Sequence, residues 1–102
     1  MVKIWRQGDV IVRQVSEVPK RVVEAATNEI RIASETGNPH VLKASKVYVP
    51  ANVRVVQNLQ QYAVLEEPTS MTHPQHAALD LLPGVYQVST VRDYAPSAML
   101  LD

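Results

Sequence analysis

Three histidines are the residues of this sequence whose type and spacing best suit chemistry. His73 and His76 stand three positions apart, a spacing at which two imidazole rings can face one point. His40 follows a turn-forming segment at positions 36–39, and Glu35 precedes that segment. Imidazole nitrogens and carboxylates are ligands of divalent transition metals, and a site with an open position can hold water or substrate. We therefore predict a candidate metal site made by His40, His73, His76 and Glu35, with Zn, Fe, Mn or Ni as the ion.

The alternative role of these histidines is ordinary solvation or hydrogen bonding to the backbone, because the His-x-x-His spacing alone has low specificity. Other catalytic patterns are missing from the sequence. There is no Gly-x-Ser-x-Gly elbow and no glycine-rich phosphate loop. The chain has no cysteine, which excludes disulfides, thiolate nucleophiles and zinc–sulfur sites. The lack of a complete catalytic motif favours a protein that is not an enzyme.

The elements that must position these residues are predicted to be strands. Apolar and polar residues alternate over 29–34, where Ile30 and Ile32 share one face, and this is typical of a half-buried antiparallel strand. Segment 16–28 allows either one or two turns of helix or a loop, and segment 68–76, with two prolines, is predicted to be a loop. Residues 3–7 and 9–15 are predicted to form the first strand or a hairpin, and the other predicted strands occupy residues 41–43, 47–49, 52–57, 61–66, 79–81 and 85–94.

This pattern of about eight short antiparallel strands predicts an all-β fold, either a small β-barrel or a two-sheet sandwich. The length of 102 residues fits a single β domain over positions 1–102. Segments 52–57 and 61–66 are expected to pair as a hairpin.

Composition narrows the partners that we expect. Ten Lys and Arg balance ten Asp and Glu, which argues against nucleic-acid binding because that binding needs excess cationic charge. No apolar run approaches the length of a membrane span, and the start has no apolar core of signal-peptide length. We therefore expect no membrane contact and a cytoplasmic location, in the host cytoplasm if the gene is from a phage. A net charge of zero does little to prevent homo-oligomers.

Four short motifs carry a resemblance to a known family. They are Arg-Gln-Gly-Asp-Val at 6–10, Ser-Glu-Thr-Gly-Asn-Pro-His at 34–40, Thr-His-Pro-Gln-His at 72–76 and Leu-Pro-Gly-Val-Tyr-Gln-Val at 82–88. With them the chain resembles a family of small uncharacterised bacterial and phage proteins. In that family the middle motif reads Gly-His-x-His, so the resemblance implies a four-histidine cluster that is reduced to three here by Asn38. The outline is also similar to cupins, although their His-x-His motif with a spaced glutamate is absent.

Three functions remain open at this point. The first is a non-catalytic binding or accessory protein of bacterial or phage origin that acts through a protein partner or a small ligand. The second is a metal-dependent, cupin-like enzyme that uses the three histidines. The third is a structural subunit that self-assembles through exposed strand edges or the apolar tail at 98–101.

Overall fold

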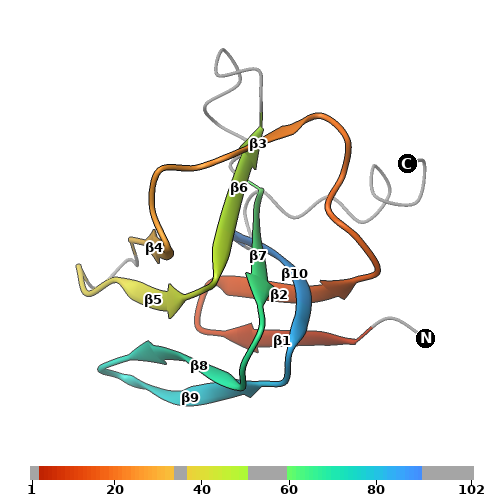
Figure 1. The fold of residues 1–102 in the computed structure, drawn as a ribbon. Helices are drawn as coiled ribbons and strands as arrows, with labels where there is room; N and C mark the ends of the chain where they lie inside the picture. Colours follow the sequence, from red (N-terminus) through yellow and green to blue (C-terminus); the bar gives the residue numbers. More distant parts are fainter. Residues whose placement is uncertain (1–2, 34–36, 51–59, 91–102) are drawn as a thin grey trace.

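A computed structural model describes residues 3–33, 37–50 and 60–90, and in these ranges every regular element is a β-strand (Figure 1). The ten strands are β1 (Ile4–Gln7), β2 (Val10–Val15), β3 (Val22–Glu24), β4 (Glu29–Ile32), β5 (His40–Lys43), β6 (Lys46–Pro50), β7 (Gln61–Leu65), β8 (Thr69–His73), β9 (His76–Leu81) and β10 (Gly84–Thr90). Within the described ranges, no helix is long and apolar enough to cross a membrane.

The strands form two antiparallel sheets that together make the predicted all-β fold. Six strands lie in the order β1-β2-β10-β7-β6-β3, and four lie in the order β4-β5-β8-β9. The two sheets are not joined into one closed barrel by the backbone pairing of the described strands. The all-β prediction is therefore confirmed, and of the two predicted architectures the structure matches two sheets.

The core lies between the sheets and is filled by the alternate side chains of each strand. Ile30 and Ile32 of β4 are buried, as their alternation predicts, and Val10 and Val12 of β2 have no exposed surface. Burying a side chain of this size stabilises the fold by about 1.5–3 kcal/mol. The remaining buried apolar residues come from both sheets and include Leu42, Val47, Leu65, Met71, Leu81, Tyr86 and Val88.

Two segments differ from their sequence-based predictions. Residues 22–24 form strand β3, which pairs with β6, instead of a helical turn or loop. The two valines of β3 are β-branched, and such side chains favour a pleated strand over a helix. Segment 68–76 is mostly the β8–β9 hairpin rather than a loop, with Pro74 and Gln75 as its turn.

Strand β7 has a described partner on each side, β6 on one and β10 on the other. The hairpin predicted between 52–57 and 61–66 involves residues outside the described ranges. Segment 52–57 itself, the residues after 90 and Glu35 lie outside the described residues.

A bulge in the β8–β9 hairpin shapes the end of the molecule that carries the histidines. Met71 pairs with Leu79 and His73 pairs with His76, so Thr72 faces two residues on β9, Ala77 and Ala78. A bulge of this kind interrupts the regular ladder and leaves backbone groups that must find other partners.

Candidate functional site

Three strands bring the three histidines together. His40 is the first residue of β5, His73 is the last residue of β8 and His76 is the first residue of β9. The ring centroid of His40 lies 4.3 Å from that of His73 and 6.0 Å from that of His76, and the last two are 4.7 Å apart. The predicted gathering of His40, His73 and His76 is therefore present, whereas Glu35 falls outside the described residues.

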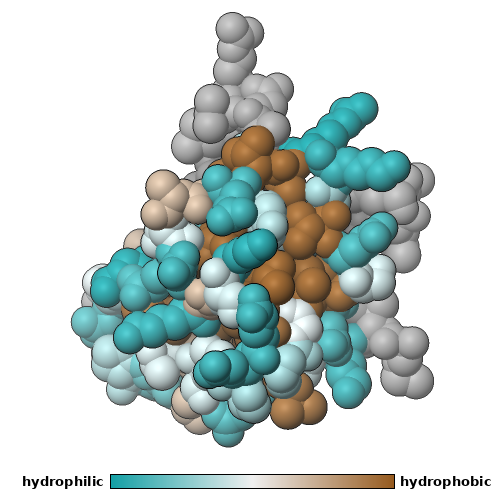
Figure 2. All heavy atoms as spheres, viewed as in Figure 1, coloured by the Kyte–Doolittle hydropathy of each residue, from teal (hydrophilic) through white to brown (hydrophobic). Residues whose placement is uncertain are grey.

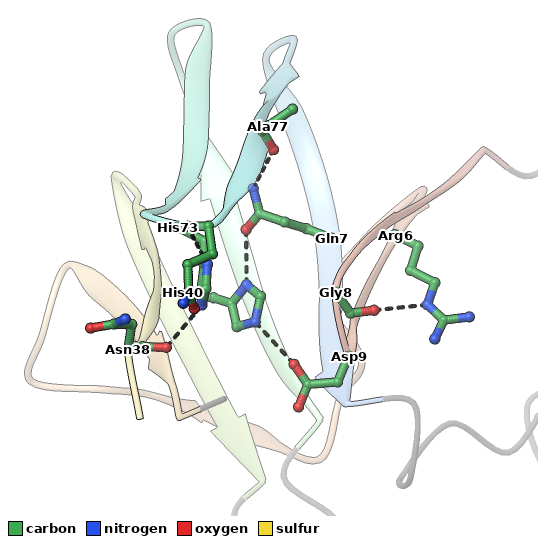
Figure 3. A network of polar contacts seen from close by, with 9 residues as sticks. Arg6, Gln7, Gly8, Asp9, Asn38, His40, His73 and Ala77 are labelled. Atoms are coloured by element: carbon green, nitrogen blue, oxygen red, sulfur yellow. Dashed lines mark hydrogen bonds and ion pairs between the residues drawn. The ribbon is translucent and has the colours of Figure 1, made fainter. Parts of the chain in front are cut away.

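His40 is fully buried and is held at both ring nitrogens (Figure 3). Its Nδ1 lies 2.9 Å from Gln7 Oε1, and its Nε2 lies 3.0 Å from Asp9 Oδ1. Both partners come from the β1–β2 hairpin, Gln7 at the end of β1 and Asp9 in the turn. The imidazole therefore connects this hairpin to β5.

The other hydrogen bonds of the Gln7 side chain determine that its oxygen faces the ring of His40. Its Nε2 donates to Met71 O at 3.0 Å and to Ala77 O at 2.8 Å, two carbonyls on either side of the bulge. An amide has its two donors on nitrogen alone, so the oxygen of Gln7 must point at His40. His40 Nδ1 consequently carries a hydrogen and donates it to Gln7 Oε1.

His73 is also buried and is held in one tautomer. The backbone N–H of Gln75 donates to His73 Nδ1 at 3.0 Å, and His73 Nε2 donates to Asn38 O at 3.0 Å. An imidazole nitrogen that accepts a hydrogen bond has no hydrogen of its own, so the proton of the neutral ring is on Nε2. Asn38 thus contacts the cluster through its backbone carbonyl.

Gly8 lets the hairpin turn approach the rings. Its φ of +58° belongs to the left-handed region that favours glycine. A Cβ at this position would lie 2.7 Å from His76 Nε2 and 3.2 Å from His40 Cε1. The backbone conformation therefore favours glycine, and a side chain here would also have to displace the ring of His76.

The electrostatic surroundings of His40 oppose its protonation overall. Burial lowers the pKa of His40 from its usual 6.5, and the nearby rings of His73 and His76 lower it further. The hydrogen bond with Asp9 and the charge of that carboxylate act in the opposite direction. Burial is the largest of these effects, so neutral His40 is favoured near pH 7.

The chemical capacity of the cluster follows from these contacts. Both ring nitrogens of His40 and of His73 have partners in the protein, and His76 is the exposed member. In the described ranges no three His, Asp or Glu side chains are arranged to hold a metal ion. The metal site predicted from the sequence stays a prediction, and no ligand set for it is identified here.

Sequence reasoning missed the partners that organise the cluster. The segment 7–9 predicts a turn or bulge, and the turn is present, but nothing local in it shows that Gln7 and Asp9 face His40. Gln7 lies 64 and 70 positions from the carbonyls that it binds. The one signal in the sequence for these partners is that Gln7, Gly8 and Asp9 all lie in the motif at 6–10, which is part of the family resemblance.

Comparison with known proteins gives a family and no function. No curated protein and no solved structure matches the chain. A family model described as "Domain of unknown function (DUF8820)" matches residues 6–91, which include every residue of the cluster. Because this match covers most of the sequence, the chain belongs to that family of uncharacterised domains.

Proposed function

We propose that this chain is a non-catalytic binding module, in which the buried rings of His40 and His73 hold the fold together and the outer surface engages a protein partner. The observation that carries the proposal is the hydrogen bonding of His40, whose two ring nitrogens are both used inside the protein. These contacts support a structural role for His40 in place of a catalytic one.

The position of His40 argues against a role as a general base. Such a base must come within hydrogen-bond reach of the substrate. His40 has no exposed surface, and the carboxylate paired with it, Asp9, is the group nearer to solvent, with 33% of its side chain exposed. A catalytic pair normally has the opposite order, with the carboxylate buried behind an accessible imidazole.

The surface supplies apolar side chains for an interface. Among the residues that the structure describes, the strongly exposed large hydrophobic ones are Ile4 on β1, Val23 on β3 and Leu82 before β10. Ile4 and Val23 lie on the two edge strands of the six-stranded sheet. Figure 2 shows hydrophobic side chains gathered over β3 and continuing toward the middle of that face. Exposed apolar patches are common at protein–protein interfaces.

The first experiment tests the absence of catalysis. Wild-type protein and the His76→Ala variant are assayed with general substrates for ester, phosphate-ester, glycoside and peptide hydrolysis. We expect neither protein to exceed the buffer rate. His76 is chosen because it is the exposed ring of the cluster. The proposal would be overturned if the wild type shows turnover and His76→Ala does not.

The second experiment tests binding. Proteins recovered from an extract of the source organism with the wild type are compared with those recovered with Ile4→Asp, Val23→Asp and Leu82→Asp. We expect at least one of these variants to keep the Tm of the wild type and yet to bind the partner at least about tenfold more weakly. The reason is that a charge buried in an apolar interface opposes binding. Binding is then measured with the purified partner. Identical recovery with all four proteins would contradict the proposal, and recovery of this chain alone would favour a self-assembling subunit.

A metal titration separates this proposal from the metal-dependent alternative. An ion at His40 would have to displace Asp9 from Nε2, and an ion at His73 would break the hydrogen bond that Nδ1 accepts from the Gln75 N–H. We therefore expect chelator-treated protein to take up less than about a tenth of an equivalent of Zn²⁺ or Ni²⁺ at micromolar concentration. One full equivalent, lost in His73→Ala, would instead support the enzyme hypothesis.

A further inference from the structure

The hairpin of β1 and β2 has an outer face that the core does not use. Its inward side chains pack in the core or bind the histidine cluster, and they are Trp5, Gln7, Val10 and Val12. Because side chains alternate along a strand, the outward ones are Ile4, Arg6, Ile11 and Arg13. Figure 3 shows this for β1, where Gln7 points toward the histidines and Arg6 points away from them.

The register of the two strands arranges these four side chains as two crossing diagonals. Ile4 pairs with Arg13, and Arg6 pairs with Ile11. The two arginines are therefore diagonal neighbours with their Cβ atoms about 7 Å apart, and so are the two isoleucines. A single carboxylate can contact both guanidinium groups, since arginine side chains are long and their N–H groups match carboxylate oxygens.

Neither arginine has a carboxylate partner within the described ranges, where the ion pairs involve other side chains. Arg6 donates from Nε to Gly8 O at 2.8 Å, which holds the guanidinium group and leaves the N–H groups of its two terminal nitrogens for another acceptor. In the same part of the chain, the side chain of Arg13 makes no hydrogen bond or ion pair. The neighbouring strands offer no anion, because β1, β2 and β10 contain no acidic residue.

We propose that this β1–β2 outer face, formed by Ile4, Arg6, Ile11 and Arg13, docks a segment of a partner protein that carries carboxylates beside apolar side chains. The carboxylates accept charge-assisted hydrogen bonds from the two arginines. The apolar side chains cover the two isoleucines, of which Ile4 is 51% exposed. This surface depends on the proposed function, since it names the chemistry of the partner that the binding module engages.

A protein segment suits the β1–β2 outer face better than a nucleic acid does. Binding to a phosphate backbone needs excess cationic charge, and in this chain ten Lys and Arg are balanced by ten Asp and Glu. Half of the side chains on the face are isoleucines, which offer nothing to a phosphate. Arginine set among apolar side chains is instead common at protein–protein interfaces.

Two variants remove the charge that this docking requires. Arg13→Gln is the cleaner change, because its side chain has no hydrogen bond in the described structure to lose. The double variant Arg6→Gln/Arg13→Gln removes both cations. Lys43→Gln is the matched control, because Lys43 is exposed on β5 of the other sheet and its loss changes the net charge as Arg13→Gln does. Thermal unfolding checks that Arg13→Gln and Lys43→Gln keep the Tm of the wild type.

The probe is a library of random displayed peptides selected on the wild type at physiological salt. We expect the binders to be enriched in Asp and Glu with an aliphatic residue nearby, and to shift the backbone amide signals of β1 and β2. Their affinity should fall at least about tenfold in the double variant and about threefold in Arg13→Gln, and it should be unchanged in Lys43→Gln. Raising the salt concentration should weaken binding to the wild type, because exposed charges are screened.

Three results would overturn this docking surface: a library that yields no binder, binders without acidic enrichment, or equal affinity for the wild type and the double variant. A DNA duplex that binds more tightly than every selected peptide, and is lost by the double variant, would also overturn it, because the face would then recognise phosphate. The partner from the extract experiment separates this surface from the proposed function. If the double variant keeps that partner while Val23→Asp or Leu82→Asp loses it, the binding module stands and the β1–β2 outer face is not its interface.

Discussion

Replacing Gln7 by alanine is expected to lower the free energy of unfolding by about 3 kcal/mol, because the change leaves three partners, two of them buried, without a hydrogen bond. These partners are Met71 O, Ala77 O and His40 Nδ1. Water cannot replace the lost amide freely, since Gln7 is itself only 2% exposed. Gln7→Glu is expected to destabilise at least as strongly, because its carboxylate places oxygen against two carbonyl oxygens. The measurement is denaturant unfolding with the m-value checked.

The control for this prediction is Gln75→Ala. Gln75 is exposed in the β8–β9 turn, and it holds His73 through its backbone N–H, which alanine retains. We expect its stability to stay within about 0.5 kcal/mol of the wild type. A loss below about 1 kcal/mol in Gln7→Ala would mean that the amide does not join the hairpin to the bulge as described.

The second large effect is expected at Gly8. Gly8→Ala should lower the free energy of unfolding by about 2 kcal/mol, in part because a non-glycine residue is strained at a φ of +58°. The remainder comes from the new Cβ, which must displace the ring of His76 and presses on His40. The His76→Ala background removes the closest of these contacts and should therefore reduce the loss to about 1 kcal/mol. Thermal or denaturant unfolding of the four proteins measures this double-mutant cycle.

Gly37 supplies the matched control. Its φ of +88° is also in the left-handed region, but a Cβ there would meet nothing within 4 Å. Gly37→Ala should therefore report backbone strain alone, about 1 kcal/mol, with no dependence on His76. If Gly8→Ala and Gly37→Ala lose the same stability in both backgrounds, the close packing of the turn against His76 is not energetically important.

The parts of the fold that could be predicted from the sequence are those encoded by neighbouring residues. The alternation around Ile30 and Ile32 places both in the core, because side chains on a strand alternate between its two faces. The turn residues around Gly8 and Gly37 mark where the chain reverses. The gathering of His40, His73 and His76 was also predictable, since each lies beside such a reversal.

Other parts depend on contacts that local patterns do not contain. Pro74 suggested a long loop, yet it occupies a tight turn, where the missing N–H of proline removes no ladder bond. The role of Gln7 depends on a bulge more than sixty positions away, which the sequence around Gln7 cannot reveal. The pairing of β7 with β6 and β10 likewise could not be predicted, because local sequence patterns do not show which of several strands become neighbours in a sheet.

The central claim is that the ring nitrogens of His40 and His73 are engaged by the protein itself, so that the cluster is a structural joint between the β1–β2 turn and the four-stranded sheet. The most direct test is the ¹⁵N spectrum of the histidine side chains near pH 8. The structure predicts a hydrogen fixed on Nδ1 of His40 and on Nε2 of His73, each in a single tautomer. Rings that exchange between tautomers like free imidazole, or nitrogen shifts that change on addition of one equivalent of Zn²⁺, would contradict it.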